Sequence, residues 1–287
     1  MLKKLLYILF QGNLFIALCA AAYCIETAYI FDLQIENLAF YLWIFFATLL
    51  AYNLHSLAAI RNSNAAGMPQ LIDPFARFIH PMLTAIAALG TGYFTTRIDL
   101  GEHWIVMLIT ALLTIGYSYP LLFWRSKRKL REYGIAKIVI LALVWTISTV
   151  FLPLQDPLWY TNPIVWLVMA RRFLFMLALC LPFDIRDVEK DRLQGIATVP
   201  NVIGVQRTYR LINQLLLTIF VLTLPAFFLG AWGITTAILF SVMFTGTIIY
   251  LSRQNKHPLM YLGAIDGMIL LQALLVTFFV HLQKYGF

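Results

Sequence analysis

The stretch PIVWLVMARRFLFMLALCLP, residues 163–182, is followed at once by FDIRDVEKDR, residues 183–192. The first part is long and apolar enough to cross a bilayer as a helix, which takes about 20 residues. The second part holds four of the 13 acidic residues of the chain. Together they predict a membrane helix that ends in an acidic segment at the membrane surface.

The composition extends this prediction to the whole chain. Of its 287 residues 61% are hydrophobic and 12% are charged, and the mean hydropathy is +0.81. Soluble domains carry about 25% charged residues, so an ordinary soluble fold is excluded. The net charge of +8 is typical of basic cytoplasmic loops, and we set nucleic acid aside as a partner.

Apolar runs of spanning length recur nine times, and none shows the polar alternation of barrel strands. We therefore expect an all-α, polytopic membrane protein with a bundle of nine transmembrane helices. No linker or low-complexity tract divides the chain, so residues 1–287 are expected to form a single domain. The nine runs are residues 5–23, 38–59, 79–95, 104–123, 135–153, 163–182, 211–229, 233–251 and 261–282.

The orientation follows from the basic residues, because positively charged loops stay cytoplasmic. Sixteen of the 21 Lys and Arg residues fall on one side of this arrangement, and only Arg97 and Lys284 fall on the other. The pattern predicts a cytoplasmic N-terminus and an outside C-terminus in a multi-pass protein of a bacterial plasma membrane. Cleavage of the first run as a signal peptide is the alternative, but Glu26 and Asp32 suit an outside loop after a first span.

The acidic segment is the strongest candidate site. At about 100° per residue, Asp184, Asp187 and Asp191 fall within a ~60° arc of one helix face. Carboxylates so close together repel one another unless a cation such as Mg²⁺ lies among them, and Mg²⁺ often shares carboxylates with phosphate groups. A metal-bound diphosphate is the expected guest. The alternative is a solvated helix start in which these residues pair with neighbouring Arg and Lys.

The segment resembles the second aspartate-rich motif of the UbiA-type membrane prenyltransferases. The matching pattern is Asp184-x-x-Asp187-x-x-x-Asp191-Arg192-x-x-Gly195-x-x-Thr198-x-Pro200, and Gly204 continues it. The resemblance implies Mg²⁺-dependent transfer of a prenyl chain from a prenyl diphosphate to a small acceptor, which is often aromatic in this family. It implies catalytic and metal-binding roles for Asp184, Asp187 and Asp191, and substrate-binding roles for Asn53, Arg61, Arg186 and Arg192.

The chain departs from the family at its first motif. Asn53 is present, but Leu57 and Arg61 stand where the family carries aspartates four and eight positions later. Either Arg61 supplies a positive charge in place of a metal, or the protein has kept the fold and lost or changed the reaction. Asp73 in the same loop is a further, less favoured candidate ligand, because Asp73-Pro74 also indicates a turn. The family's Tyr-x-x-x-Lys pattern is also absent, since Tyr117 and Tyr119 precede Leu121 and Phe123.

Other ionisable residues lie inside predicted helices, where charge is expensive. We expect Asp266 to pair with Lys137 or a nearby amide, and Lys137 to reach the interface. Arg171 and Arg172 are expected to extend outward to the interface, or the helix extends beyond the bilayer. The basic residues Arg125, Lys127, Arg128, Lys129 and Arg131 are expected to set topology and contact lipid headgroups. Cys19, Cys24, Cys180 and the five histidines show no metal-ligand spacing.

Two functions from other classes stay open. A non-catalytic membrane scaffold or lipid-binding protein is favoured by the incomplete first motif. A transporter is disfavoured, because carriers usually place ionisable groups near the bilayer midplane, whereas this acidic cluster lies at the cytoplasmic end of a helix. The expected partners are a prenyl diphosphate, a small acceptor and membrane lipids.

Overall fold

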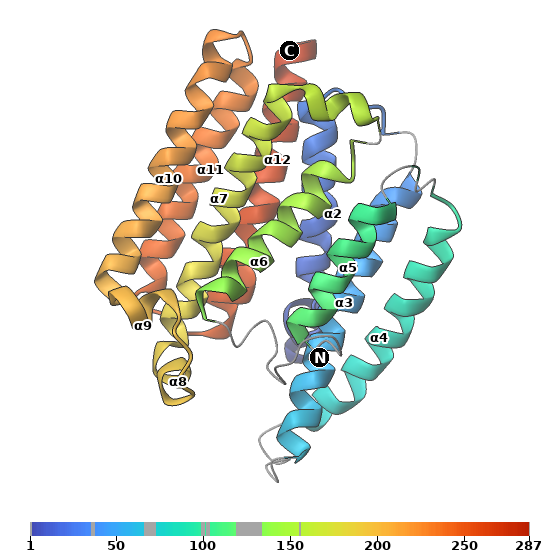
Figure 1. Ribbon diagram of the computed structural model, residues 1–287, viewed down its shortest axis with the longest axis vertical. Helices are drawn as coiled ribbons and strands as arrows, with labels where there is room; N and C mark the ends of the chain where they lie inside the picture. Colours follow the sequence, from blue (N-terminus) through green and yellow to red (C-terminus); the bar gives the residue numbers. More distant parts are fainter. Residues whose placement is uncertain are drawn as a thin grey trace.

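The protein is all-α throughout the part that the structure, a computed structural model, describes (Figure 1). This part comprises residues 2–35, 38–65, 73–98, 101, 104–118, 134–154 and 156–286. Each of the nine apolar runs of the sequence contributes a helix here. The long helices are α2 (Leu14–Ile30), α3 (Leu38–Ala65), α4 (Pro74–Thr95), α5 (Trp104–Ser118), α6 (Ile135–Thr146), α7 (Pro163–Arg186), α10 (Val205–Phe228), α11 (Trp232–Ser252) and α12 (Asp266–Tyr285).

Short helical pieces extend or connect these helices. Two π-helical stretches, one after α6 and one before α12, lengthen those helices into longer apolar runs. The short elements are α1 (Leu2–Leu6), η1 (Tyr7–Gln11), η5 (Ile147–Phe151), η6 (Pro157–Thr161), α8 (Val188–Leu193), α9 (Val199–Ile203) and η7 (Met260–Ile265).

Length and composition qualify five of the described helices as membrane spans, namely α3, α7, α10, α11 and η7 with α12. The number rises to six when the bent pair Leu2–Gln11 and Leu14–Ile30 is counted as one span. Two apolar helices, Trp104–Gly116 and Ile135–Phe151, are shorter. An integral membrane protein is therefore supported, whereas the number of nine crossings and the orientation in the membrane stay predictions.

The first predicted helix is not continuous. The chain bends by 49° between Gln11 and Leu14, where Asn13 adopts the left-handed conformation with φ 67°. Asparagine tolerates this region because its short side chain can bond locally. At Gly12 a Cβ would lie 2.3 Å from the carbonyl oxygen of Ile8, so the bend requires glycine. The expectation of one unbroken helix over residues 5–23 was wrong.

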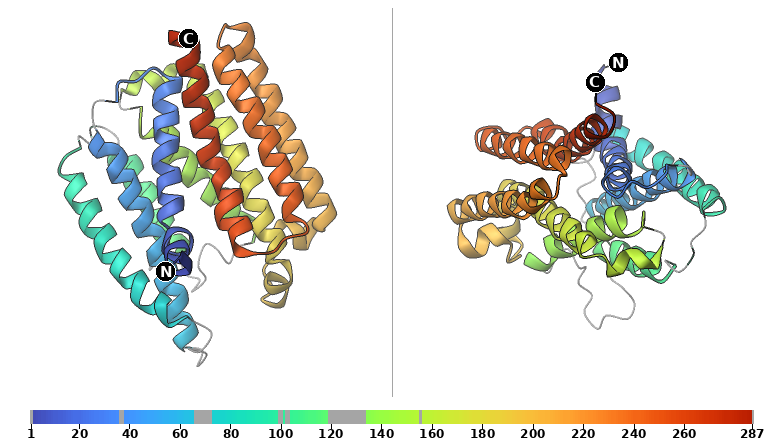
Figure 2. Two further views of the ribbon diagram at one scale, coloured as in Figure 1. Left: turned by 180° about the vertical axis from the view of Figure 1, so that it is seen from behind. Right: turned by 90° about the horizontal axis from the view of Figure 1, so that it is seen from above.

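Eight of the described helices form a ring. Contacts between neighbours follow the order α2, α3, α5, α6, α7, α10, α11, α12 and back to α2, while α4 packs on the outside of α3 (Figure 2). The described termini lie at opposite ends of the bundle, and α8 lies at the same end as the N-terminus (Figure 1). The acidic segment therefore lies at the N-terminal end of the ring.

Candidate active site

Two aspartates of the acidic segment are held together by a lysine from another helix. The Lys137 Nζ lies 2.8 Å from Asp184 Oδ1 and 3.2 Å from Asp191 Oδ2. Lys137 belongs to the first turn of α6, Asp184 to the last turn of α7, and Asp191 to α8. Asp184 and Asp191 are buried, at 4% and 7% exposure. This is a partly desolvated cluster of two carboxylates and one ammonium, in which electrostatic interactions are stronger than on an open surface.

The third aspartate, Asp187, does not contact Lys137. Asp187 interrupts the helix between α7 and α8, and its carboxylate is bound in two-pronged fashion by the Arg186 guanidinium at 2.9 Å to each oxygen. The expectation that all three aspartates share one face of a continuous helix was wrong, because the turn at Asp187 redirects that side chain. Among the described residues no three His, Cys, Asp or Glu side chains gather closely enough to hold a metal ion.

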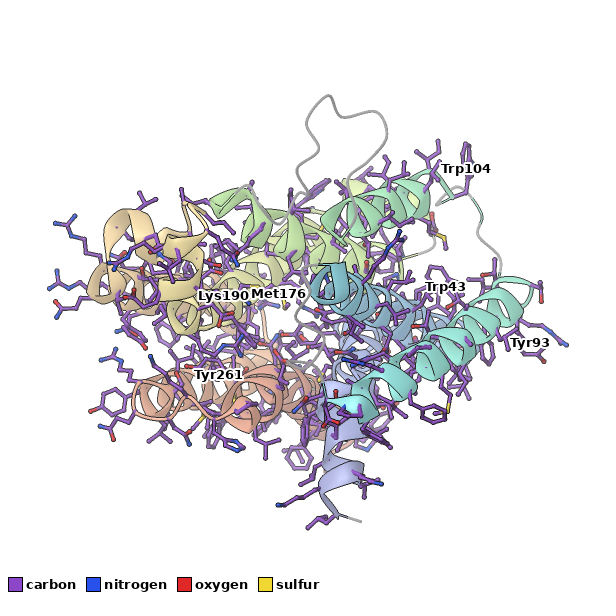
Figure 3. All side chains as sticks on the ribbon, turned by 90° about the horizontal axis from the view of Figure 1, so that it is seen from below. Trp43, Tyr93, Trp104, Met176, Lys190 and Tyr261 are labelled. Atoms are coloured by element: carbon purple, nitrogen blue, oxygen red, sulfur yellow. The ribbon has the colours of Figure 1, made fainter. Side chains whose placement is uncertain are left out.

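Arg186 is itself positioned by aromatic rings. Its guanidinium lies 5.2 Å from the Phe183 ring centroid and 4.8 Å from that of Tyr261, and the two rings meet edge to face. Tyr261 comes from η7 and approaches from a different element of the ring (Figure 3). Cation–π contacts of this kind hold a guanidinium while its N–H groups stay available for an anion.

Arg192 lies away from this cluster. It pairs with Glu189 at 3.2 Å, and both side chains are more than two-thirds exposed. Such exposed pairs along a helix contribute little to stability. The alternative of a solvated helix start with exposed ion pairs therefore describes Glu189 and Arg192, but it does not describe the buried Asp184 and Asp191.

The segment after α8 closes against the start of α6. Ile196 N–H donates to the Asp191 carbonyl at 2.9 Å, and a Cβ on Gly134 would lie 2.2 Å from the Ala197 carbonyl oxygen. Gly134 also has φ +57°, a region that favours glycine. This close approach brings the first turn of α6, and with it Lys137, against α8. Sequence reasoning missed Gly134 as a site residue, and its position three residues before Lys137 was the available signal.

Asn53 is committed to the fold. Its Nδ2 donates to the carbonyls of Gly12 (3.1 Å) and Leu49 (3.0 Å), and its Oδ1 lies 2.7 Å from His80 Nδ1. The residue is fully buried and ties the bend before α2 to α3 and α4. Asn53 therefore stabilises the fold, and both N–H donors of its side-chain amide are already used within the protein.

The remaining first-motif positions lie at the ends of α3 and α4. Arg61 is exposed in the last turns of α3. Asp73 caps α4 by accepting a hydrogen bond from Phe75 N–H at 2.8 Å, with Pro74 in the first turn. The capping role agrees with the turn that the Asp-Pro pair indicates. The basic residues 125–131, together with Tyr119, Leu121 and Phe123, lie outside the described residues.

A large apolar chamber lies between α3, α5 and α6, and Ala20 of α2 and Thr91 of α4 also line it. Its volume is about 840 Å³, within the range of roughly 300–1,000 Å³ that small-molecule sites occupy. Trp43 of α3 and Trp104 of α5 are among its lining residues. Trp145 Nε1 donates to Tyr52 Oη at 3.1 Å, which links α6 to α3 at the chamber wall. Further polar lining groups are Thr48, His55, Thr91, Thr110, Thr114, Ser148 and Thr149.

The chamber and the acidic cluster share one face of α6. Leu141 and Val144 line the chamber and follow Lys137 by four and seven residues, spacings that place them on one side of a helix. Val144 lies about 10 Å further along the helix axis than Lys137, at 1.5 Å per residue. A molecule with a charged head at Lys137 and an apolar tail would thus extend along this face into the chamber.

Arg171 and Arg172 do not extend outward. Both are buried in α7 at 6% and 2% exposure, and Arg172 forms an ion pair with Glu26 of α2 at 3.1 Å. Glu26 was expected to flank an outside loop but lies inside the bundle, because α2 continues to Ile30. These expectations were wrong since the ring supplies internal partners that no linear reading of the chain reveals.

Lys137 also differs from expectation. Its ion pairs are with Asp184 and Asp191, not with Asp266, and this places its ammonium inside the ring instead of at the lipid interface. Asp266 begins α12, and its carbonyl accepts a hydrogen bond from Cys19 Sγ at 3.7 Å.

Comparison with solved structures shows what this fold is similar to. The chain superposes with a TM-score of 0.58 and 14% sequence identity on a digeranylgeranylglyceryl phosphate synthase studied in membranes, covering 97% of this chain and 98% of that one. No protein-family model and no curated protein matches the sequence. The likeness shows a shared fold over nearly the full length of both chains.

Proposed function

We propose that this protein is a membrane-embedded prenyltransferase that moves a prenyl chain from a prenyl diphosphate to a small acceptor. The observation that carries the proposal is the position of the buried pair Asp184 and Asp191, beside the helix face that leads into an apolar chamber of about 840 Å³. The shared fold with a synthase of a digeranylgeranylglyceryl lipid supports a prenyltransferase-like function in general.

The reaction needs positive groups around the diphosphate and an apolar environment around the prenyl chain, and the chain offers both. The bond between the first carbon of the prenyl chain and the diphosphate oxygen breaks, and the oxygen keeps the electron pair. The acceptor then bonds to that carbon and loses a proton. Positive groups stabilise the departing diphosphate, while an apolar chamber with aromatic walls excludes water and shelters the allylic cation. Trp43, Tyr52 and Trp145 supply such aromatic faces.

The carboxylate pair fits the donor set of Mg²⁺. Mg²⁺ is usually held by one or two protein carboxylates together with substrate phosphates and water. Asp184 and Asp191 converge on one cationic nitrogen, and Asp184 Oδ2 is buried without a hydrogen-bond partner among the described residues. Bound there, Mg²⁺ would offset the charge of the diphosphate. Asp187 would join as a ligand only after release from Arg186.

Positive side chains complete the proposed diphosphate site. Lys137 and Arg186 both lie beside the carboxylates, and the planar fork of Arg186 matches phosphate oxygens as well as it matches Asp187. Lys137 would exchange part of its contact with Asp184 and Asp191 for the incoming diphosphate. Arg61 and Arg192 are exposed, so we assign them at most a role in attracting the anionic head. We place the protein in a bacterial plasma membrane.

Purified protein in lipid vesicles with Mg²⁺ should convert prenyl diphosphates of several lengths to prenylated products in a host lipid extract, detected by mass spectrometry. Asp191→Asn should lower turnover at least about 100-fold, in keeping with loss of an electrostatic group that acts on the transition state. Glu189→Gln, an exposed carboxylate two residues away, is the matched control and should stay active. Full activity of Asp191→Asn would show that the assigned site is wrong.

A non-catalytic lipid-binding protein is the second candidate, favoured by Leu57 and Arg61 at the positions of the missing first-motif aspartates. This protein would bind prenyl diphosphates and yield no product with any donor or acceptor. Equilibrium binding of a labelled prenyl diphosphate, measured beside turnover, separates the two candidates.

A further inference from the structure

A second buried polar cluster lies among α2, α7 and α12, near the middle of α7. Arg172 is fully engaged there. Its Nη2 lies 3.1 Å from Glu26 Oε1. Its Nη1 donates to Thr149 Oγ1 at 3.0 Å and to the Tyr23 carbonyl at 3.3 Å. The guanidinium also lies 3.7 Å from the centroid of the Tyr23 ring. Glu26 thus neutralises Arg172.

The Glu26 carboxylate is also held in place by hydrogen bonds among neutral side chains. Glu26 Oε1 accepts a hydrogen bond from Gln272 Nε2 at 3.2 Å, and Gln272 Oε1 accepts one from Ser241 Oγ at 3.1 Å. These contacts hold the Glu26 side chain toward Arg172 and join α2 to α11 and α12. They leave one charge in the cluster without a counterpart.

That charge belongs to Arg171. The side chain is buried at 6% exposure, and its Nε has no hydrogen-bond partner among the described residues. Its charged neighbours are Glu26 and Arg172, so the cluster holds two cations and one anion. An uncompensated charge in an apolar interior is strongly unfavourable, more so than an unmade hydrogen bond between neutral groups.

A small cavity adjoins the Arg171 guanidinium, whose Nε is the unpartnered atom. Its volume is about 10 Å³, and Glu26, Arg171, Arg172 and Gln272 line it together with apolar side chains of α7, α10 and α11. This is room for a single water-sized guest. We propose that the cavity is a binding site for one small monovalent anion of the chloride class, held by Arg171 and neutralising the cluster.

Charge decides between a water molecule and a small anion as the guest. A water molecule would satisfy the Arg171 N–H and could donate to Glu26 Oε2, which is also buried and unpartnered among the described residues, but it would leave the net charge of the cluster unchanged. A halide accepts the same N–H and removes that charge. The proposal is independent of the prenyl transfer reaction, since none of these residues lines the chamber except Thr149 at its edge.

Thermal unfolding of the detergent-purified protein tests the site. At equal ionic strength, the midpoint should rise by about 3 °C or more in sodium chloride relative to sodium gluconate, whose anion is too large for the cavity, and the rise should saturate. Arg171→Gln should abolish this difference and be no less stable than the unaltered protein in gluconate. Arg207→Gln, which removes an exposed arginine on α10, is the matched control and should keep the difference.

Bromide provides a measurement that needs no variant. Anomalous scattering from crystals of the unaltered protein grown in bromide should place one ion beside the Arg171 guanidinium. Equal midpoints in chloride and gluconate, an unchanged chloride effect in Arg171→Gln, or a water molecule without anomalous signal in the cavity would each overturn the proposal.

Discussion

Lys137 is the residue on which the acidic cluster depends. Asp184 and Asp191 belong to different helices, and the ammonium between them is the contact that brings their carboxylates together. Removing one member of a buried charge cluster leaves the others uncompensated, which usually destabilises a protein more than loss of the attraction alone. The same reasoning distinguishes this cluster from the exposed pair of Glu189 and Arg192.

Lys137→Met should therefore lower the free energy of unfolding by about 3 kcal/mol. Adding Asp184→Asn to this variant should restore part of the loss, because it removes one of two facing carboxylates, although Asp184→Asn alone should destabilise the protein. Unfolding midpoints in detergent for the four proteins of this cycle measure the effect. Lys190→Met, at an exposed position of α8, is the control. A destabilisation that Asp184→Asn deepens in both backgrounds would contradict the proposed pairing.

Asn53 is expected to act on stability and not on substrate binding. Asn53→Leu breaks three hydrogen bonds in the buried junction of Gly12, Leu49 and His80, and the free energy of unfolding should fall by about 2–4 kcal/mol. Asn213→Leu, at an exposed position of α10, should change it by no more than about 0.5 kcal/mol. Folded Asn53→Leu protein that binds a prenyl diphosphate ten times more weakly, with unaltered stability, would assign Asn53 to the substrate site.

At the scale of elements, the site depends on how α6 begins. Gly134 has a positive φ and touches the segment between α8 and α9, so α6 starts close enough for Lys137 to reach across to α7 and α8. The break between α7 and α8 at Asp187 acts in the same direction, because it turns Asp187 toward Arg186 and Asp191 toward Lys137.

Gly134→Ala should destabilise the protein and lower prenyl transfer. A Cβ there adds a clash with the Ala197 carbonyl, at 2.2 Å, to the strain of a positive φ. Gly230→Ala separates the two effects, since Gly230 has φ +84° and an added Cβ would meet no atom within 4 Å; it should show only the strain of about 1–2 kcal/mol. Equal losses in the two variants would argue against a tight contact between α6 and the segment after α8.

At the scale of the whole molecule, a large apolar chamber lies between α3, α5 and α6, and the charged cluster of Lys137, Asp184 and Asp191 lies further along α6. If the chamber holds the prenyl chain, its length should limit the donors that bind. Each buried methylene group contributes about 0.8 kcal/mol, so a blocked chamber should weaken long donors much more than short ones.

Ala51→Phe should shift donor preference toward shorter prenyl diphosphates. Ala51 lines the chamber from α3, and a phenyl ring there should weaken binding of the longest accepted donor about tenfold or more while short donors bind unchanged. Ala88→Phe places the same ring on the exposed face of α4 and should leave the length profile intact. Identical profiles for all three proteins would remove the chamber from the substrate site.

The orientation of the ring can be read by cysteine labelling. The native cysteines Cys19, Cys24 and Cys180 are buried, so background labelling should be low. Leu193 after the acidic segment and Leu229 at the far end of α10 are 87% and 77% exposed. In sealed right-side-out vesicles an impermeant maleimide should label Leu229→Cys and spare Leu193→Cys until the membrane is opened. The reverse pattern would invert the predicted topology.

The amino-acid sequence by itself determined that the protein is built of apolar, membrane-type helices. Each of its nine apolar runs contributes a helix to the described structure, although the first run is bent between Gln11 and Leu14. Apolar runs of spanning length have no stable alternative to a helix in lipid, and this requirement is local to each run. The sequence also showed the acidic segment that contains Asp184 and Asp191, because a cluster of carboxylates directly after an apolar run is a local pattern, while their role in binding a diphosphate stays a prediction.

Only the tertiary structure decided which charges meet. Lys137 joins Asp184 and Asp191 across three elements, and Arg172 joins Glu26 across more than 140 residues of sequence. Such pairings depend on which helices are neighbours in the ring, and hydropathy carries no information about neighbours. The contact of Arg186 with Tyr261 likewise forms only when α7 and η7 lie side by side.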